Sequence, residues 1–213
     1  MKTLLSITMM FLLMFSAAYA ADEIKTDKKA DKKVEKMEKY TKRNADNPEI
    51  AIETDFGTMK LELFHDLAPG HADSMLARAK DGFYNGLIFH RIIDGFMIQG
   101  GDPQGTGMGG APYNLMAEFS DVPHIDGTLS MARAQSPNSA SSQFFICLGR
   151  QASLDGKYTV FGQVMEGMDV LHKLGKVPCG GPQKSKPNKD VFIRKMTVLK
   201  DLPAKKADRK SVV

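Results

Sequence analysis

Apolar and polar residues alternate along several short stretches of this chain, which is the pattern of β-strands with one buried face. The first two stretches, Ile50–Glu53 and Thr58–Phe64, flank the turn Asp55-Phe56-Gly57 and predict a β-hairpin. The same alternation predicts strands at Leu87–Ile93, Phe96–Gln99, Thr128–Arg133, Gln143–Leu148, Tyr158–Val164 and Val191–Leu199. Turn residues such as Asp94-Gly95 separate consecutive strands.

Helical periodicity is confined to two short segments of the folded region. Pro69 opens a helix predicted over Ala68–Asp81, and Gly82 ends it. A second helix is predicted over Glu166–Leu174 and stops at Gly175. Many short strands with two short helices predict a mainly β fold. We expect a largely antiparallel sheet that closes into a β-barrel, because closure removes exposed strand edges, with the helices capping the open ends.

The N-terminus has the three parts of a secretory signal peptide. Lys2 is the positive region, Leu4–Phe15 the apolar region and Ala18-Tyr19-Ala20 a cleavage site with small residues. The apolar run is shorter than the roughly 20 residues that a transmembrane helix needs. We therefore assign residues 1–20 to a signal peptide and expect an exported protein. An uncleaved N-terminal segment that tethers the protein to a membrane is the alternative.

Charge patterning divides the rest of the chain. Residues 21–47 alternate Lys with Asp and Glu and contain few apolar residues, which predicts a charged flexible linker. Residues 48–200 form the predicted folded domain, and residues 201–213 form a polar, basic C-terminal tail. The chain has 213 residues, enough for one domain with tails.

Composition excludes several classes of function. The formal net charge of +4 is too small to indicate nucleic-acid binding. Gly105–Gly110 fits the pattern GxGxxG, but Ala111-Pro112-Tyr113-Asn114 follows it and is poor helix material, so we predict a surface loop. The five histidines lack metal-ligand spacing, and we expect no metal and no cofactor. Whether Cys147 and Cys179 pair stays open, although an exported protein permits a disulfide.

The segment Phe89–Asp102, FHRIIDGFMIQGGD, is the most distinctive part of the chain. It places Arg91 among apolar side chains, where burial of a guanidinium is costly unless its donors are used. Together with Ser142–Leu148, SQFFICL, it predicts an apolar patch with one fixed cation and one fixed amide. An arginine paired with an acid on the surface is the alternative. His90 adjoins Arg91, and neighbours on a strand point to opposite faces, so we expect a structural histidine there.

Four motifs together resemble one known family. FHRIIDGFMIQGGDPQGTGMGG, LSMARA, SSQFFICL and LDGKYTVFGQVMEGMDVL closely resemble the cyclophilin family of peptidyl-prolyl cis-trans isomerases, from about Ile50 to Leu199. The resemblance implies a closed eight-stranded antiparallel β-barrel capped by two α-helices. It implies catalysed rotation about Xaa-Pro peptide bonds without a cofactor. The MAR variant resembles bacterial exported cyclophilins, which suits a periplasmic location and unfolded exported proteins as proline-containing substrates. The sequence does not establish the oligomeric state, and we assume a monomer.

The resemblance also implies a role for individual residues. Arg91 matches the catalytic arginine and Gln99 the glutamine that helps to position the arginine and the substrate, and Phe96 completes the catalytic set. The pocket for the proline ring is formed by Phe96 with Met97, Phe145 and Leu154, and the neighbouring groove by Ala132, Ala134 and Gln143. The substrate-binding set is completed by Arg133 and Tyr158.

Several positions depart from the best-known eukaryotic pattern of the family. Arg133 stands where an asparagine is usual, Tyr158 where a histidine closes the pocket, and Ser153 where a tryptophan often contributes to cyclosporin binding. The loop Gln135–Ser141 is one residue longer. We expect isomerase activity with weak cyclosporin sensitivity. The alternative function is a proline-peptide-binding module or holdase chaperone with little turnover.

Overall fold

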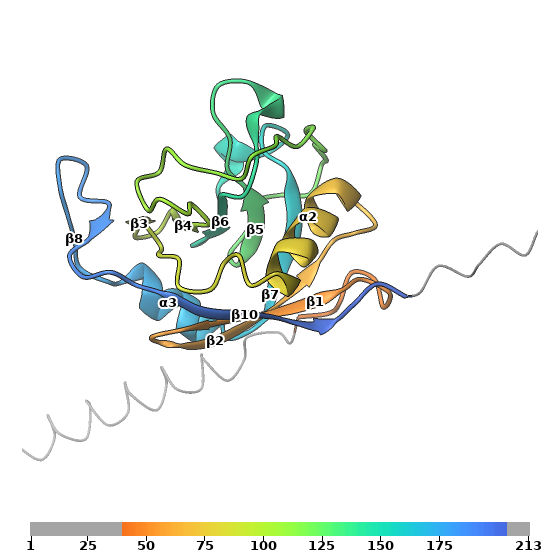
Figure 1. Ribbon diagram of the computed structural model, residues 1–213, viewed down its shortest axis with the longest axis horizontal. Coiled ribbons are helices and arrows are strands. Elements are labelled where there is room, and N and C mark those ends of the chain that lie inside the picture. The colour runs from red at the N-terminus through yellow and green to blue at the C-terminus, as the bar shows by residue number, and fades with distance from the viewer. Residues whose placement is uncertain (1–39, 204–213) are drawn as a thin grey trace, which may run out of the picture. The chain divides into compact units, whose positions relative to one another are not determined.

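Short antiparallel strands dominate the computed structural model, which describes residues 40–203. The strands are Glu49–Thr54 (β1), Gly57–Leu63 (β2), Arg91–Ile93 (β3), Met97–Gly100 (β4), Thr128–Met131 (β5), Phe144–Cys147 (β6), Val160–Glu166 (β7) and Ile193–Lys200 (β10). They form one sheet in the order β10-β1-β2-β7-β5-β6-β4-β3, with every neighbouring pair antiparallel (Figure 1). The predicted signal peptide, most of the linker and most of the C-terminal tail lie outside the described residues.

The sheet curls so that its two edges approach each other. Residues just before β3 and β10 are joined by an isolated bridge between Ile88 and Phe192, and by a hydrogen bond of 2.9 Å from the Phe89 N–H to the Val191 carbonyl. The strands β3 and β10 themselves do not pair within residues 40–203. The structure therefore has the expected mainly β fold as a curled eight-stranded sheet, whereas its closure into a barrel remains a prediction.

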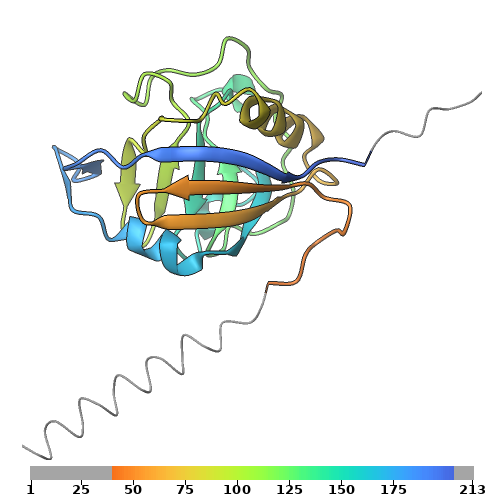
Figure 2. The same cartoon turned by 60° about the horizontal axis from the view of Figure 1, so that its bottom comes forward.

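Both predicted helices are present. Pro69–Lys80 (α2) contacts β10 and β7, and Met168–Gly175 (α3) contacts β2, β3 and β4, so the two helices lie on opposite sides of the strands (Figure 2). The predicted start of α3 at Glu166 is wrong, because β7 continues to that residue. Gly167 then separates strand from helix with a φ of 88°, which a residue without a Cβ adopts at little cost.

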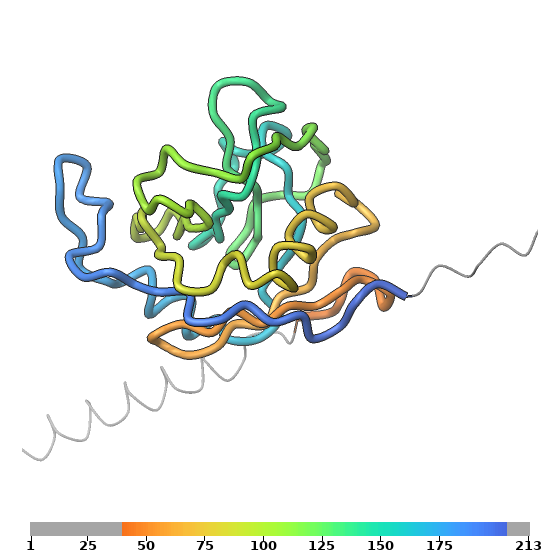
Figure 3. The backbone as a smooth tube through the Cα atoms, viewed as in Figure 1, coloured from red at the N-terminus to blue at the C-terminus, as the bar shows by residue number. Residues whose placement is uncertain are grey.

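Four small elements were not predicted from alternation or helical periodicity. Two 3₁₀-helices cover Pro137–Ser139 (η1) and Ala152–Leu154 (η2). The strands Cys179–Gly180 (β8) and Lys186–Pro187 (β9) form a hairpin of their own. The Ile92 N–H donates a hydrogen bond of 2.7 Å to the Ser185 carbonyl and joins this hairpin to β3, beside which the hairpin projects (Figure 3).

Strand alternation sorts the side chains of the sheet into two rows. Ile92, Ile98, Ile146 and Leu129 are paired in register across β3, β4, β6 and β5, and all four are buried in the main core. Since successive side chains point to opposite faces, their neighbours along each strand face away from that core. The main core fixes the strands, and the opposite row is free to build a site.

The residues directly before β1 pack against the domain around one buried carboxylate. Glu62 is fully buried and accepts hydrogen bonds from the Tyr40 hydroxyl at 2.9 Å, the Arg43 N–H at 2.9 Å, the Asn44 N–H at 3.0 Å and Asn47 Nδ2 at 2.8 Å. Four donors satisfy a charge that would otherwise be costly to bury. Residues 40–47 are the part of the predicted linker that the structure describes, and these contacts join them to the domain.

Residues 40–203 contain both cysteines of the chain. Both cysteines are free: Cys147 is buried in β6, and Cys179 is half-buried in β8. No helix in this part of the chain has the length and apolar content to cross a membrane.

Candidate functional site

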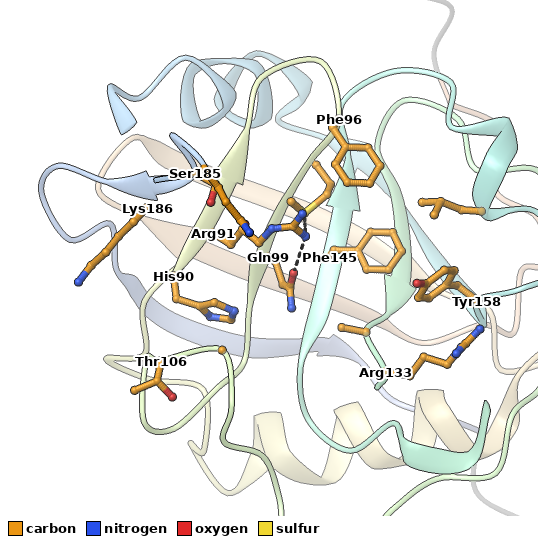
Figure 4. A pocket seen from close by; sticks show the side chains of 16 residues that line it. His90, Arg91, Phe96, Gln99, Thr106, Arg133, Phe145, Tyr158, Ser185 and Lys186 are labelled. Atoms are coloured by element: carbon orange, nitrogen blue, oxygen red, sulfur yellow. Dashed lines mark hydrogen bonds between the residues drawn. The ribbon is translucent and has the colours of Figure 1, made fainter. Parts of the chain in front are cut away.

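The row of side chains that faces away from the main core gathers the predicted site. Arg91 is paired with Gln99 across β3 and β4, and Gln99 with Phe145 across β4 and β6. Met97 is paired with Cys147 on the same face. Strand pairing thus brings residues 54 positions apart in the chain onto one surface, and Figure 4 shows Arg91, Gln99 and Phe145 side by side.

The guanidinium of Arg91 is held by three neighbours. Nη1 donates a hydrogen bond of 3.2 Å to Gln99 Oε1 and lies 4.0 Å from Met97 Sδ. Its carbon atom lies 5.8 Å from the ring centroid of Phe96, within cation–π range. Among residues 40–203 the remaining N–H groups of Arg91 have no hydrogen-bond acceptor, so they are free to donate to a bound molecule.

An apolar surface lies beside this cation. Met97, Phe145 and Cys147 form a small buried cluster separate from the main core, and Ile93, Phe96, Ala132, Leu154 and Tyr158 pack against it. A cavity of about 710 Å³ is bordered by Arg91 and by the members of this group other than Cys147 and Ile93 (Figure 4). A small apolar ring fits such a surface, and Arg91 stands at the edge of the place that the ring would occupy.

A chain of amide groups links Arg91 to a neighbouring loop. Gln99 Nε2 donates a hydrogen bond of 2.8 Å to Gln143 Oε1, and Gln143 Nε2 donates to the carbonyls of Gly107 at 3.0 Å and Gly109 at 2.7 Å. Each amide uses its oxygen and its nitrogen, so the orientation of Gln99 is determined by both neighbours.

The loop that closes this side of the cavity is organised by a buried carboxylate. Asp102 accepts hydrogen bonds from the N–H groups of Gln104 at 2.8 Å, Thr106 at 2.9 Å, Gly107 at 2.6 Å and Gly109 at 3.2 Å. Burial alone would raise the pKa of Asp102, but these amides outweigh burial and lower it. Gly105, Thr106 and Gly107, which belong to the predicted surface loop, thus form a fixed wall of the cavity.

The predicted site residues fall into two adjoining hollows. The first cavity is lined by Arg91, Phe96, Met97, Gln99, Ala132, Arg133, Phe145, Leu154 and Tyr158. A second hollow of about 500 Å³ is lined by Ala134 and Gln143, and it shares Gln99, Ala132 and Arg133 with the first. All the predicted residues therefore lie in one continuous region.

The prediction that only one of His90 and Arg91 faces a site is wrong. Both line the first cavity, because β3 begins at Arg91 and His90 precedes it in irregular backbone, where strict alternation does not apply. Both ring nitrogens of His90 are buried without a hydrogen-bond partner in the described residues. Burial lowers the pKa of His90, with Asp102 opposing this effect and Arg91 adding to it, so the ring is neutral at pH 7.

Sequence reasoning missed the residues that loops bring to the cavity. The loop held by Asp102 contributes Gly105, Thr106 and Gly107, and the β8–β9 hairpin contributes Gln183, Ser185 and Lys186. The glycine pattern marked the first group without showing its place. Nothing in the pattern of residues 178–188 connects the second group with β3, because their contact depends on long-range strand geometry.

Comparison with known proteins agrees with this geometry. Residues 49–198 match the family model described as cyclophilin type peptidyl-prolyl cis-trans isomerase/CLD. The chain belongs to the cyclophilin-type peptidyl-prolyl cis-trans isomerases.

Individual cyclophilin relatives are similar over most of the domain. A peptidyl-prolyl cis-trans isomerase of Synechococcus elongatus is 51% identical over 125 residues, which are 58% of this chain and 86% of the relative. A peptidyl-prolyl cis-trans isomerase-like 3 of Gallus gallus is 42% identical over 154 residues, 70% of this chain and 94% of the relative. The crystal structure of a cyclophilin type isomerase of Cryptosporidium parvum aligns with a TM-score of 0.69 and 34% identity, covering 73% of this chain and 99% of that one.

The same Cryptosporidium parvum cyclophilin was also crystallised in the presence of the dipeptide Ala-Pro, and that structure aligns with a TM-score of 0.68, 34% identity and coverage of 72% of this chain and 99% of that one. The chain is thus an isomerase of the cyclophilin type. Within residues 40–203, no three His, Cys, Asp or Glu side chains gather as metal ligands would.

Proposed function

We propose that Arg91 catalyses isomerisation by donating a hydrogen bond to the prolyl nitrogen of the substrate. The barrier to rotation, about 18–20 kcal/mol, exists because that nitrogen shares its lone pair with the carbonyl. A donor to the nitrogen localises the lone pair and weakens the double-bond character. The nitrogen accepts this bond in the twisted transition state and barely in the planar ground state, so the interaction is differential, as catalysis requires.

The observation that carries this proposal is the free donor set of Arg91 at the edge of an apolar cavity. Gln99 occupies Nη1 and fixes the plane of the guanidinium, which leaves the other N–H groups for the substrate. A charge-assisted hydrogen bond contributes about 1.5–3 kcal/mol, equivalent to roughly 10- to 150-fold in rate. Any acceleration beyond that must come from other parts of the site.

The apolar cluster supplies the second contribution. We assign Phe96, Met97, Phe145, Leu154 and Tyr158 to the pocket for the proline ring, which burial of apolar surface would hold in place. The flanking residues of the substrate would lie along Ala132, Arg133, Ala134 and Gln143, where backbone groups and the Gln143 amide are available. The pocket would hold the proline ring in place while the preceding residue of the substrate rotates. The Xaa-Pro bond would then stay aligned with the guanidinium of Arg91.

We further propose that the protein is a periplasmic catalyst that accelerates the folding of exported proteins as a monomer. The support is in the sequence: a positive residue, an apolar run and Ala18-Tyr19-Ala20 precede the domain. Prolyl isomerisation takes roughly 10–100 s without a catalyst and limits the folding of many chains. Prolyl isomerisation would therefore also limit the folding of chains that fold after export, outside the cytoplasm.

Refolding of a protein limited by proline isomerisation tests this function. The wild-type protein is expected to accelerate the slow refolding phase, and Arg91→Ala is expected to remove that acceleration while binding of the unfolded chain persists. Equal acceleration by both proteins would contradict the assignment of Arg91.

Cell fractionation with N-terminal sequencing tests the proposed location. It is expected to find a mature chain that begins near Ala21, and an uncleaved membrane-bound chain would support a tethered protein.

A second candidate function is a holdase that grips unfolded chains. The observation in its favour is a set of exposed apolar side chains on the loop after β4, where Met108 is 89% and Met116 is 71% exposed. Met108 borders the second hollow, so apolar segments of a bound chain could reach it from the groove. Suppression of aggregation that survives Arg91→Ala but is lost in Met108→Ser would support this function.

We also infer that the curled sheet behaves as a closed barrel. The hydrogen bonds from the Phe89 N–H to the Val191 carbonyl and from the Ile193 N–H to the Leu87 carbonyl, 2.9 Å and 2.8 Å long, support this inference. Hydrogen exchange is expected to show these amides as protected as those inside β1 and β2. Rapid exchange at both would show that the edges open.

A further inference from the structure

Two residues that depart from the eukaryotic cyclophilin pattern contact each other. The guanidinium carbon of Arg133 lies 4.7 Å from the ring centroid of Tyr158, and Figure 4 shows the two side chains together at one end of the cavity. This distance is well within the range of a cation–π interaction. Each residue lines the cavity, so the contact is part of its wall.

The guanidinium of Arg133 is fixed by backbone carbonyls. Nε donates a hydrogen bond of 3.0 Å to the Lys157 carbonyl, and Nη1 donates to the carbonyls of Ala134 at 2.9 Å and Gln135 at 3.0 Å. The guanidinium of an arginine is planar and has several donors, so it makes these bonds and still presents its face to a ring. The ammonium of a lysine cannot do both. The residue thus ties the chain after Met131 to the residue before Tyr158.

The Tyr158 ring also contacts Phe145, a member of the buried apolar cluster. Its centroid lies 5.7 Å from that of Phe145, with an angle of 84° between the rings, which is an edge-to-face arrangement. Arg133, Tyr158 and Phe145 therefore form a continuous row of contacts from the groove to the buried cluster. The Tyr158 hydroxyl has no hydrogen-bond partner among residues 40–203, so the ring is positioned by its two neighbours.

We propose that Arg133 is a positioning residue for the isomerase reaction, which holds the Tyr158 ring against Phe145 as a wall of the pocket for proline. The proposal rests on the assignment of that pocket to the proline ring. Arg133 and Tyr158, which both depart from the eukaryotic pattern of the family, would then act as one functional unit. An asparagine at position 133 is too short to span the Tyr158 ring, and the histidine usual at position 158 offers a smaller one.

The expected effect on KM and kcat depends on the stage of the reaction at which the Tyr158 ring contacts the substrate. A wall that contacts the proline ring before and during rotation contributes equally to substrate and transition state, and its loss raises KM with little change in kcat. A cation–π contact at a partly exposed site contributes about 0.5–1 kcal/mol, which corresponds to roughly 2- to 5-fold. This is the size of effect expected for Arg133→Ala.

A double-mutant cycle on the full-length protein tests the proposal with a neutral Ala-Pro peptide as substrate. Arg133→Ala is expected to lower kcat/KM about 2- to 5-fold, mainly through KM. Arg133→Lys should recover only part of this loss, because a lysine keeps the charge without the fork. In the Tyr158→Leu background, Arg133→Ala should cause no further loss. Additive losses in the two backgrounds would overturn the proposal.

A control separates positioning from general stability. Arg194 lies 4.6 Å from the ring of Phe192 in the same type of contact, but neither residue lines the cavity. Arg194→Ala is expected to leave KM unchanged. Nuclear magnetic resonance should show the ring protons of Tyr158 shifted in Arg133→Ala, with the thermal unfolding midpoint near that of Arg194→Ala. Unmoved ring signals would count against the proposal.

A second control separates positioning from direct recognition of substrate charge. If Arg133 acted by attracting an acidic substrate, the loss in Arg133→Ala would be larger for a peptide with Glu beside the Ala-Pro unit than for one with Lys. The proposal predicts the same loss for both, since the guanidinium is engaged by carbonyls and the ring. A wild-type protein that fails to isomerise any peptide would instead refute the proposed function of the site.

Discussion

Arg91 and Gln99 face each other across β3 and β4, and Nη1 of the arginine donates a hydrogen bond of 3.2 Å to Oε1 of the glutamine. The pair joins a cation at the edge of an apolar cavity to an amide chain that ends in the loop 105–110. Register fixes the pair, because a slip of one residue would turn Arg91 into the main core. The orientation of the catalytic group is thus a consequence of strand pairing.

Removal of the glutamine tests this relationship. Gln99→Leu leaves Arg91 without its acceptor and Gln143 without a donor, and we expect kcat/KM for an Ala-Pro peptide to fall about tenfold, equivalent to ~1.4 kcal/mol. Gln104→Leu changes an exposed glutamine whose side chain does not line the cavity and serves as control. Gln99→Leu activity equal to that of the control would show that Arg91 needs no such support.

The sequence predicted those parts of the structure that local pattern determines. Alternation placed most strands within a few residues, and the arginine among apolar residues marked the site. The failures have physical causes: Leu87–His90 precedes β3 in irregular backbone, so His90 and Arg91 share a cavity despite being neighbours. The contribution of Ser185 and Lys186 depends on a hydrogen bond between residues 93 positions apart, which no local pattern encodes.

Phe145 contributes to both stability and binding. Its side chain is 5% exposed and lies between the rings of Tyr158 and His124. Phe145→Ala should lower the free energy of unfolding by about 3–5 kcal/mol, measured by urea titration. Phe145→Leu fills most of the space and should fold, with a raised KM for proline peptides. Truncation of Phe56, which is 41% exposed, should cost about 0.5 kcal/mol or less. Similar costs at the two positions would contradict the assigned packing.

Two buried histidines and one half-buried histidine predict that the domain loses stability in mild acid. Burial lowers the pKa values of His71, His90 and His124 below their ordinary 6.5, against the opposing effect of nearby carboxylates. The unfolded chain therefore binds protons more readily than the folded one. Stability is complete above about pH 6.5 and falls as the pH drops from there through the lowered folded values. The thermal midpoint measured between pH 7 and pH 5 should decrease, and less steeply in His71→Gln. A flat profile would contradict the burial of these rings.

Ser153 predicts a weak response to cyclosporin. The residue lies exposed on η2. The resemblance described above implies that Ser153 replaces a tryptophan that contributes to binding of the drug. A serine offers neither the apolar area nor the indole N–H of that residue. We expect weak inhibition of the wild-type isomerase and stronger inhibition of Ser153→Trp, with peptide turnover similar in both. Strong inhibition of the wild type would show that other residues replace the tryptophan.

The measurement that tests the account most directly is kcat/KM for isomerisation of a neutral Ala-Pro peptide by wild type, Arg91→Lys and Arg91→Ala, with peptide affinity determined alongside. We expect Arg91→Ala to lose roughly 10- to 150-fold in kcat/KM while it keeps its fold and most of its affinity. Arg91→Lys should lie between the two, because a lysine retains a charged donor without the planar fork that Gln99 orients. Equal activity of the three proteins would contradict the central claim that the guanidinium of Arg91 lowers the barrier to rotation.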